Sequence, residues 1–369
     1  MPWADVDDLN GQFECILYGN LYTDYGTIIQ NIKHKTNTDL KVKSKGNEVL
    51  IPGSDTTPTG LARALFLEKE NVILGGDINI LSVKHDDGPF LAYELNKLKK
   101  ELIIRIKGTT VKHLQNNDLK DIVVSLPSLE EQRKISSLFS RLDNTITLQQ
   151  RKLNSLQKLK KGLLQKMFPK NGENIPEIRF PEFSDAWKQR ELGEIAERVT
   201  RRNSSLESQT PLTISAEYGL IDQNKFFGKR IAAKDLSNYY LIQKGEFAYN
   251  KSTSNDAPWG AIKRLDCYNN GALSTLYIVF KIKDNKSCYS DFLVTYYGTS
   301  LWHKGVKEIA SEGARNHGLL NVSPSDFFRT KLVIPQDFEE QRKIGAFFTQ
   351  LDNTITLQQR WLFYTHKQS

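Results

Sequence analysis

Residues 142–151 read LDNTITLQQR, and residues 351–360 read the same ten letters. The likeness extends outward: EEQRKISSLFSRLDNTITLQQRKL (130–153) aligns with EEQRKIGAFFTQLDNTITLQQRWL (339–362) at a constant offset of 209 residues. Just upstream, LKDIVVSLPSLEEQ and FRTKLVIPQDFEEQ share an apolar run and a proline, with one residue inserted in the second copy. The chain therefore contains an internal duplication of a strand, a turn and the start of a helix.

The repeated stretch has the periodicity of a helix with a narrow apolar stripe. Its apolar residues recur at steps of three and four: Ile135, Phe139, Leu142, Ile146, Leu153, Leu156, Leu163 and Met167. Acidic residues at 130–131 and lysines from 158 onward suit the helix dipole, and no helix breaker precedes Gly162 and Pro169. The pattern predicts a helix of about 37 residues, roughly 55 Å long, whose stripe packs on a partner helix started by the second copy. Such stripes are typical of a coiled coil or a helical hairpin without chemistry of its own.

Composition limits the class of protein. The 369 residues suffice for two or three domains, and 39% hydrophobic residues suffice for packed cores. Lysine and arginine number 51 against 43 aspartate and glutamate, a formal charge of +8 that favours a polyanionic partner such as nucleic acid. No apolar run reaches 18 residues and the N-terminus reads MPWADVDD, so we expect neither a membrane span nor a signal peptide, and a cytoplasmic protein.

The sequence offers no catalytic or metal site. Cys15, Cys267 and Cys288 are odd in number and far apart, so we expect ordinary thiols. The stretch DAPW (256–259) differs from the [ND]PP[YFW] motif of amino-methyltransferases, and no glycine-rich cofactor loop precedes it. FGKR (227–230) lacks the residues of a phosphate-binding loop, and no His/Cys/Asp cluster has metal spacing. We therefore expect no catalytic residue, no metal and no cofactor.

Two blocks of α+β character flank the repeated helices. Residues 1–128 contain the strand-like runs VLIPG (49–53), INILSV (78–83) and DIVVSL (121–126), and residues 171–336 contain the alternating LSTLYIVFKI (273–282). This predicts a first domain over 1–128, a helical spacer over 129–170, a second domain over 171–336 and a distal helix over 337–369.

The order of these motifs resembles the specificity subunit of type I restriction-modification systems, HsdS. The resemblance covers essentially the whole chain and is carried by LDNTITLQQ, the EEQRKI helix start, IRFPEFSDAW (178–187) and ELGEIAERV (191–199). Five further segments look like parts of that family's target recognition domains: YGNLYTDYG (18–26), VLIPGSDTTP (49–58), VILGGDINIL (72–81), YNKSTSNDAPWGAIKRLD (249–266) and EGARNHGLLNVSPSDFF (312–328).

The resemblance implies two α/β-mixed target recognition domains, separated by long antiparallel coiled-coil helices in a pseudo-twofold internal repeat. Each domain is expected to read one half of a bipartite double-stranded DNA target, while the helices set the distance between the halves. Two methyltransferase subunits (HsdM) and the restriction subunits (HsdR) would supply the chemistry. Two identical partners need two equivalent docking surfaces, which gives the duplication a physical reason.

Candidate DNA contacts lie in polar and basic loops of both blocks. In the second block they are Lys251, Ser252, Thr253, Ser254 and Asn255, then Lys263 and Arg264 as phosphate neutralisers, and Arg315, Asn316 and His317 in a glycine-bounded loop. In the first block they are Ser54, Asp55, Thr56 and Thr57, then Lys107, Thr109, Thr110, Lys112 and His113. The 107–113 loop is chosen because, like the 315–317 loop, it lies shortly before the last strand of its domain. Each loop also has a plain structural interpretation as a solvated turn or as a glycine-rich loop whose arginine forms an ion pair.

Three alternatives stay open: a coiled-coil adaptor that binds no DNA, a single-chain enzyme that combines recognition with methylation or cleavage, and an inactive, truncated specificity subunit. The third follows from the repeat. The counterpart of residues 175–199 would fall before residue 1, and the second copy diverges after Leu362. We expect a shortened form in which one of the two methyltransferase docking surfaces is weakened.

Overall fold

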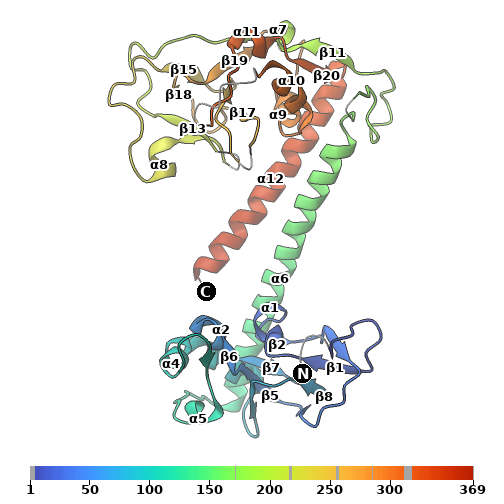
Figure 1. The fold of residues 1–369 in the computed structure, drawn as a ribbon, viewed down its shortest axis with the longest axis vertical. Helices are drawn as coiled ribbons and strands as arrows, with labels where there is room; N and C mark the ends of the chain where they lie inside the picture. Colours follow the sequence, from blue (N-terminus) through green and yellow to red (C-terminus); the bar gives the residue numbers. More distant parts are fainter. Residues whose placement is uncertain are drawn as a thin grey trace. The chain divides into compact units, whose positions relative to one another are not determined.

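The computed structural model describes residues 5–170, 172–215, 218–254, 257–284, 286–310 and 318–368, without the side chains of 366–368. The chain divides into two compact units, Met1–Gln149 and Gln150–Ser369 (Figure 1). Each unit mixes helices and strands around its own apolar core. Among the described residues, no helix is both long and apolar enough to cross a membrane.

The first unit is built on two four-stranded sheets of order β3-β1-β8-β4 and β2-β7-β5-β9, with β6 and β10 forming a separate short pair. Its strands are β1 (Phe13–Ile16), β2 (Ile28–Ile29), β3 (His34–Thr36), β4 (Lys43–Lys45), β5 (Glu48–Pro52), β6 (Ser54–Asp55), β7 (Leu65–Leu67), β8 (Glu70–Leu74), β9 (Ile78–Ser82) and β10 (Lys112–His113). Its short helices are α1 (Asn20–Thr23), α2 (Pro58–Leu61), α3 (Gly88–Lys97), α4 (Lys99–Ile104) and α5 (Asn116–Leu119). Strands β5 and β9 confirm two of the predicted runs.

Strand β5 lies at the centre of this core because every residue of EVLIP is buried. Helix α3 packs against it, and its N-terminus is capped by the Asp87 carboxylate, which accepts from the Phe90 amide at 3.0 Å. Gly88, the first residue of α3, must be glycine, since a Cβ there would come within 2.3 Å of the Phe66 ring. The sequence DGP (87–89) therefore both caps α3 and lets its first turn lie close to the sheet.

Over its described residues, the second unit forms one four-stranded sheet of order β12-β19-β16-β17 and three strand pairs, β11-β20, β13-β14 and β15-β18. The strands are β11 (Lys188–Glu191), β12 (Ala196–Arg198), β13 (Leu212–Ser215), β14 (Gly219–Asp222), β15 (Tyr240–Gln243), β16 (Phe247–Asn250), β17 (Ala261–Arg264), β18 (Asn270–Leu273), β19 (Ile278–Ile282) and β20 (Lys331–Ile334). The shorter helices are α7 (Leu192–Ile195), α8 (Gln223–Phe227), α9 (Ser290–Tyr297), α10 (Leu301–Ile309) and α11 (Pro324–Phe328).

Two predicted strands differ from the structure. The run 273–282 is not one strand: β18 ends at Leu273, a turn closed by the Tyr277 amide and the Ser274 carbonyl (3.1 Å) follows, and β19 starts at Ile278. The run 121–126 forms no strand, because no strand among the described residues pairs with it. Its counterpart in the second unit, β20, is a strand because it pairs antiparallel with β11. A strand needs a partner for its backbone groups, and apolar alternation alone does not supply one.

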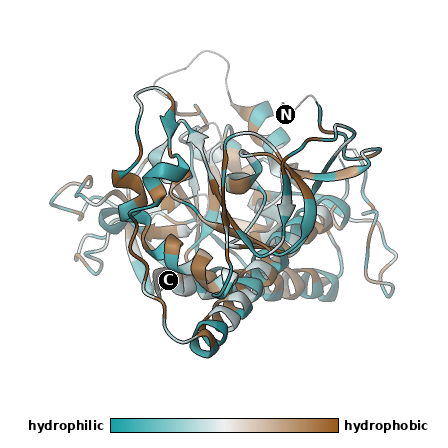
Figure 2. Cartoon of the chain, turned by 90° about the horizontal axis from the view of Figure 1, so that it is seen from below, coloured by the Kyte–Doolittle hydropathy of each residue, from teal (hydrophilic) through white to brown (hydrophobic). Residues whose placement is uncertain are grey.

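The two repeated segments form the long helices α6 (Leu129–Lys166) and α12 (Phe338–Gln368), so the predicted first helix is confirmed. The helices drawn in Figure 2 carry hydrophobic and hydrophilic residues side by side. The predicted apolar stripe of α6 is only partly covered: Leu153 and Met167 are buried, whereas Leu142 is 48% exposed. Within the second unit, Lys160 of α6 forms an ion pair with Asp352 of α12.

A buried glutamine at the start of each long helix joins it to the neighbouring mixed α/β region. In the first unit, Gln132 Oε1 accepts from the Asp87 amide at the start of α3 (2.9 Å), and Nε2 donates to the Pro127 carbonyl (2.9 Å). In the second unit, Gln341 Oε1 accepts from the Tyr289 amide at the start of α9 (2.9 Å), and Nε2 donates to the Pro335 carbonyl (3.0 Å). The duplicated sequence thus makes the same pair of contacts twice.

Candidate nucleic-acid interface

The two polar loops predicted in the first unit lie side by side. Strands β6 and β10 pair antiparallel, with Asp55 opposite Lys112 and Ser54 opposite His113. The Ser54 hydroxyl lies 2.9 Å from His113 Nδ1 and donates to Asp77 Oδ2 at 3.1 Å. Two segments about 60 residues apart in sequence therefore form one polar surface.

The 54–57 loop is held in shape by its own aspartate. Asp55 accepts from the Thr56 amide (2.6 Å) with one oxygen and from the Thr57 hydroxyl (2.9 Å) with the other. Thr57 in turn caps α2, since its hydroxyl oxygen accepts from the Gly60 amide at 3.3 Å. Asp55 and Thr57 thus have local structural roles, while the Thr56 side chain is exposed to solvent.

The basic loop of the first unit is a tight hairpin. The Lys107 amide donates to the His113 carbonyl (3.0 Å) and the His113 amide donates back (2.7 Å). Gly108 turns the chain with φ +104°, which leaves Thr109 and Thr110 exposed at the tip. The Lys107 ammonium pairs with Asp118, and this hydrogen bond lowers the pKa of that carboxyl. The Lys112 ammonium donates to the Gly108 carbonyl at 2.7 Å.

Beside this hairpin is a polar hollow of about 400 Å³ that the sequence analysis missed. Asp77, Asn79 and His113 line one part of it, and the consecutive amides Gln115, Asn116 and Asn117 line another. All three amide side chains are exposed. Asparagine and glutamine are the side chains that pair bidentately with adenine, so the triplet QNN at 115–117 was a signal available in the sequence.

In the second unit, the predicted loop after β16 is joined to residues 318–320. The Thr253 amide donates to the Gly318 carbonyl (2.6 Å), the Leu320 amide donates to the Lys251 carbonyl (2.9 Å), and Ser252 forms an isolated bridge with Leu319. The Ser254 hydroxyl accepts from the Ala257 amide at 3.2 Å. Residues 318–320 directly follow the predicted glycine-bounded loop, so the described parts of the two predicted segments meet.

Four predicted contacts of this unit, Asn255, Arg315, Asn316 and His317, lie outside the described residues. Of those that are described, Lys251 is half-buried and its ammonium donates to the Val322 carbonyl at 3.4 Å. Burial, and then the nearby Arg198 charge, lower the pKa of Lys251. Part of this lysine's donor capacity is thus used within the fold.

The two residues predicted to neutralise phosphates, Lys263 and Arg264, sit apart from that loop on β17. Burial lowers the pKa of Lys263, and the charge of Lys160 on α6 lowers it further. The Arg264 guanidinium pairs with Asp266 and with Asp291, both at 2.7 Å. The Arg264 side chain is therefore engaged within the second unit, and contact of either residue with DNA stays a prediction.

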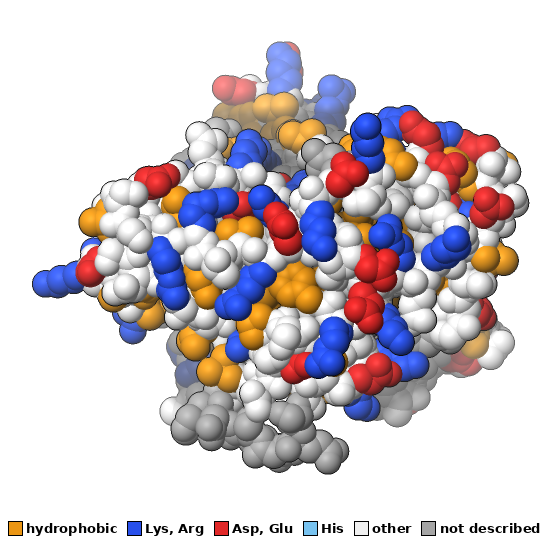
Figure 3. All heavy atoms as spheres, turned by 90° about the horizontal axis from the view of Figure 1, so that it is seen from above, with side chains coloured by type: hydrophobic (Ala, Val, Ile, Leu, Met, Phe, Trp, Pro, Cys, Tyr) orange, Lys and Arg blue, Asp and Glu red, His pale blue; other side chains and the backbone are white. Residues whose placement is uncertain are grey.

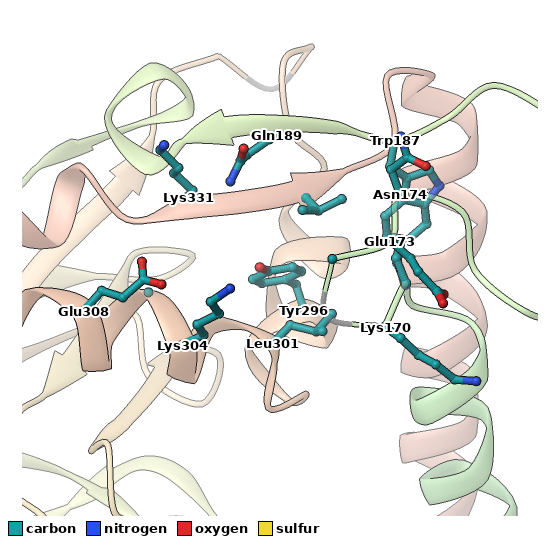
Figure 4. Close-up of a pocket in the computed structure, with 14 residues that line it drawn as sticks. Lys170, Glu173, Asn174, Trp187, Gln189, Tyr296, Leu301, Lys304, Glu308 and Lys331 are labelled. Carbon is teal, nitrogen blue, oxygen red and sulfur yellow. The ribbon is translucent and has the colours of Figure 1, made fainter.

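One face of the second unit carries mixed charge. Figure 3 shows lysine and arginine side chains scattered among acidic ones on the face seen from above. A hollow of about 520 Å³ on this unit is lined by Gln189 from β11, Lys304 and Glu308 from α10, and Lys331 from β20, among others (Figure 4). Within the described ranges, no group of histidine, cysteine, aspartate and glutamate side chains gathers that could hold a metal ion.

Comparison with known proteins gives a consistent result. Residues 2–158 match the family model described as the type I restriction modification DNA specificity domain. Over 163 residues, the chain is 29% identical to the type I restriction enzyme MjaVIII specificity subunit of Methanocaldococcus jannaschii. That match spans 44% of this chain, and the chain spans about a third (35%) of the relative's length.

The fold is also found in a solved structure. The crystal structure of the type I restriction-modification S subunit from M. genitalium superposes with a TM-score of 0.58 at 15% sequence identity, covering 99% of this chain and 88% of that one. At this identity the likeness shows the fold, which is mixed α/β. Together with the family match, it confirms the resemblance to type I specificity subunits.

Proposed function

We propose that this chain, which resembles type I specificity subunits in sequence and shares their fold, is the DNA-reading subunit of a type I restriction-modification complex. Each unit would read one half of a bipartite double-stranded target. The observation that carries the proposal is that each unit holds a polar segment in place by pairing it with a distant one: 54–55 with 112–113 in the first, and the polar 251–253 with the Gly-Leu-Leu stretch 318–320 in the second. Two separate polar surfaces suit two half-sites.

We assign different roles to the side chains of these surfaces. Asn116 and Asn117 beside the 107–113 hairpin have the amide groups that read adenine, and we add them to the predicted contacts. We assign Lys107 and Lys112 to phosphate oxygens because they lie on the same hairpin as the exposed Thr109 and Thr110, and an ammonium group has donors left beyond the one that each gives to Asp118 or to the Gly108 carbonyl. Arg315 and Asn316 keep their predicted role as base readers in the second unit.

The duplication supports two partner sites. We propose that α6 and α12 form an antiparallel, pseudo-twofold scaffold on which two methyltransferase subunits dock, with restriction subunits completing the complex. The matching glutamine contacts of Gln132 and Gln341 support this repeat at the level of individual hydrogen bonds. The chain itself would read DNA without methylating or cutting it, since its sequence has no cofactor loop or catalytic tetrapeptide. We place the complex in the cytoplasm, where its DNA target lies.

The decisive experiment maps DNA methylation in cells that express the chain with its methyltransferase partner. We expect one bipartite motif, and the double variant Asn116→Ala/Asn117→Ala should relax only one half of it, because a lost base contact costs about 1 to 3 kcal/mol at that position. The matched control is Asn224→Ala, a change of the same kind in α8 of the second unit, which should leave the first half-site unchanged.

A second measurement separates the proposal from the adaptor and single-chain enzyme alternatives. Fluorescence anisotropy with a labelled duplex that contains the mapped motif should show salt-sensitive, sequence-specific binding, and this binding should need the methyltransferase subunit. Absence of any preferred duplex would contradict DNA reading, and methyl transfer by the chain without its partner would contradict the non-catalytic role.

A further inference from the structure

A short helix of the second unit ends in two adjacent, exposed phenylalanines. Phe226 and Phe227 are the last residues of α8, and they are 47% and 45% exposed. Their rings meet edge to face, with centroids 4.9 Å apart. Among the described residues, neither ring belongs to an apolar core cluster of the unit. The pair therefore adds little to the core and suits a contact made outside the unit.

Local contacts fix both ends of α8. At its start, the Gln223 amide donates to the Pro211 carbonyl at 2.8 Å. The Asp222 carboxylate accepts from the Asn224 amide at 2.9 Å. At its end, Gly228 turns the chain with φ +64°. Figure 1 shows α8 at the outer edge of the second unit. The two rings are thus held in place before any contact forms, which lowers the entropy that the contact costs.

The chain around the two rings is basic. Four exposed cations lie within ten residues: Lys225, Lys229, Arg230 and Lys234. No described acidic side chain forms an ion pair with any of them. The two aspartates of this stretch accept from local amides instead, Asp222 from Asn224 and Asp235 from Ser237 at 2.8 Å. Positive charge therefore lies on both sides of the apolar pair.

The loop after α8 is held by bonds of its own. The Arg230 guanidinium donates to the carbonyls of Ala233 and Lys234, both at 2.9 Å. The Ala233 amide donates to the Tyr239 hydroxyl at 3.3 Å. Arg230 is thus used within the loop, whereas the ammonium groups of the three lysines have no hydrogen-bond partner among the described residues. The lysines are the cations that remain for an anionic partner.

Double-stranded DNA is the partner that this chemistry fits. Proteins that bend DNA insert apolar side chains such as phenylalanine between base steps, and they hold the flanking backbone with lysine and arginine. An apolar protein surface would leave the lysine charges unmatched. Helix α8 is also connected to the polar 251–253 segment, because β14 leads into α8 and packs on β17, which pairs with β16 just before that segment.

We propose that Phe226 and Phe227 form an apolar wedge that unstacks one base step in or beside the half-site read by the second unit. Lys225, Lys229 and Lys234 contact the flanking phosphates. The inference rests on the proposed DNA-reading function and adds DNA deformation to it. Because TA and CA/TG steps unstack most easily, the wedge selects one of these steps without a hydrogen bond to either base.

The test uses the complex of the full chain with its methyltransferase subunit, and duplexes that contain the mapped motif. Permanganate oxidises unstacked thymines, and each of the selected steps contains a thymine. We expect one reactive thymine at the wedge step with the wild-type complex and none there with Phe226→Ala/Phe227→Ala. The double variant should also bind the intact duplex about tenfold more weakly, because a contact between bases and aromatic rings is lost.

A duplex with a mismatch at the reactive step sharpens the test. The wild-type complex should bind it severalfold more tightly than the intact duplex, since a mismatched step costs less to unstack. The double variant should bind both duplexes equally. The matched control is Leu276→Ala, which removes another apolar side chain of the same unit, 56% exposed in a turn, and should leave affinity and reactivity unchanged.

The outcomes separate this inference from the proposed function. Specific binding without a reactive thymine at such a step, or with the same reactivity in the double variant, would overturn the wedge alone. Loss of the methyltransferase subunit from the double variant in native mass spectrometry would assign α8 to a protein contact and would also overturn it. A wild-type complex without any preferred duplex would overturn both.

Discussion

Replacing Gln132 by alanine tests how the first unit is held on its long helix. The side chain is 1% exposed and makes three hydrogen bonds: from the Asp87 amide (2.9 Å), to the Pro127 carbonyl (2.9 Å) and to the Asp86 carboxylate (2.8 Å). Alanine leaves the amide and the carbonyl without a partner. Each unsatisfied group costs about 1 to 3 kcal/mol, and both sites are only part-buried, so the lower end applies and the loss is about 2 kcal/mol.

The measurement must distinguish the two units, since a two-unit chain need not unfold in one step. Native-state hydrogen exchange does this, because about 2 kcal/mol corresponds to roughly thirtyfold faster exchange through unfolding of the unit. We expect that increase for the α3 amides in Gln132→Ala, with the α9 amides unchanged. Gln341→Ala should give the reverse, because its two bonds go to the Tyr289 amide and the Pro335 carbonyl.

The Asp86 carboxylate beside Gln132 allows a second test with a conservative variant. Gln132→Glu keeps an acceptor for the Asp87 amide but places a carboxylate against that of Asp86, whereas among the side-chain bonds described for Gln341 none goes to an acid. Gln132→Glu should therefore destabilise its unit more than Gln341→Glu does. A loss below about 0.5 kcal/mol for either alanine variant, or equal effects on both units from one substitution, would refute the anchor role.

Three further predictions follow from buried groups. Arg179→Ala should destabilise the second unit by about 3 kcal/mol in chemical denaturation, because it strands the Glu340 carboxylate, which is 1% exposed. Lys263→Met should stabilise the second unit at neutral pH in the same assay. Burial lowers the pKa of Lys263 in the folded protein, so the unfolded chain binds this proton more tightly and the charged lysine costs stability. The stability gained by the Met variant should therefore shrink as the pH rises toward the ordinary lysine pKa of 10.5. Iodoacetamide should label Cys267 alone in the native protein, as read by mass spectrometry, because the other two thiols are buried and their pKa values are raised to about 11 and about 12.

Much of the architecture could be predicted because it depends on local pattern. The α6 helix follows from three-and-four spacing, and β5 follows from a short apolar run between turn residues. Residues 121–126 look like a strand in isolation, but their state depends on a neighbouring strand that no local pattern reveals. The apolar stripe of α6 was likewise expected to pack on a partner helix, and its exposure at Leu142 depends on tertiary partners.

Only part of the candidate interface could be predicted, because its assembly also depends on tertiary pairing. The loops at 54–57 and 107–113 were chosen from residue types, but only the pairing of β6 with β10 brings them together. The amides at 115–117 were not among the predicted contacts, and only the structure places them beside the 107–113 hairpin. Nothing in the sequence says that the side chain of Gln132 is buried.

The contacts of Gln341 explain how the sequence of a mixed α/β region can change while the sequence of the helix that carries it stays the same. Both of its partners are main-chain atoms, the amide of Tyr289 and the carbonyl of Pro335. Substituting the Tyr289 side chain does not remove that amide, so mutations in this region leave the attachment intact provided the backbone still arrives there. The helix sequence can therefore be kept while the sequences of the attached regions diverge. The two halves of this chain show this pattern: their long helices share LDNTITLQQR, and the regions attached to them differ.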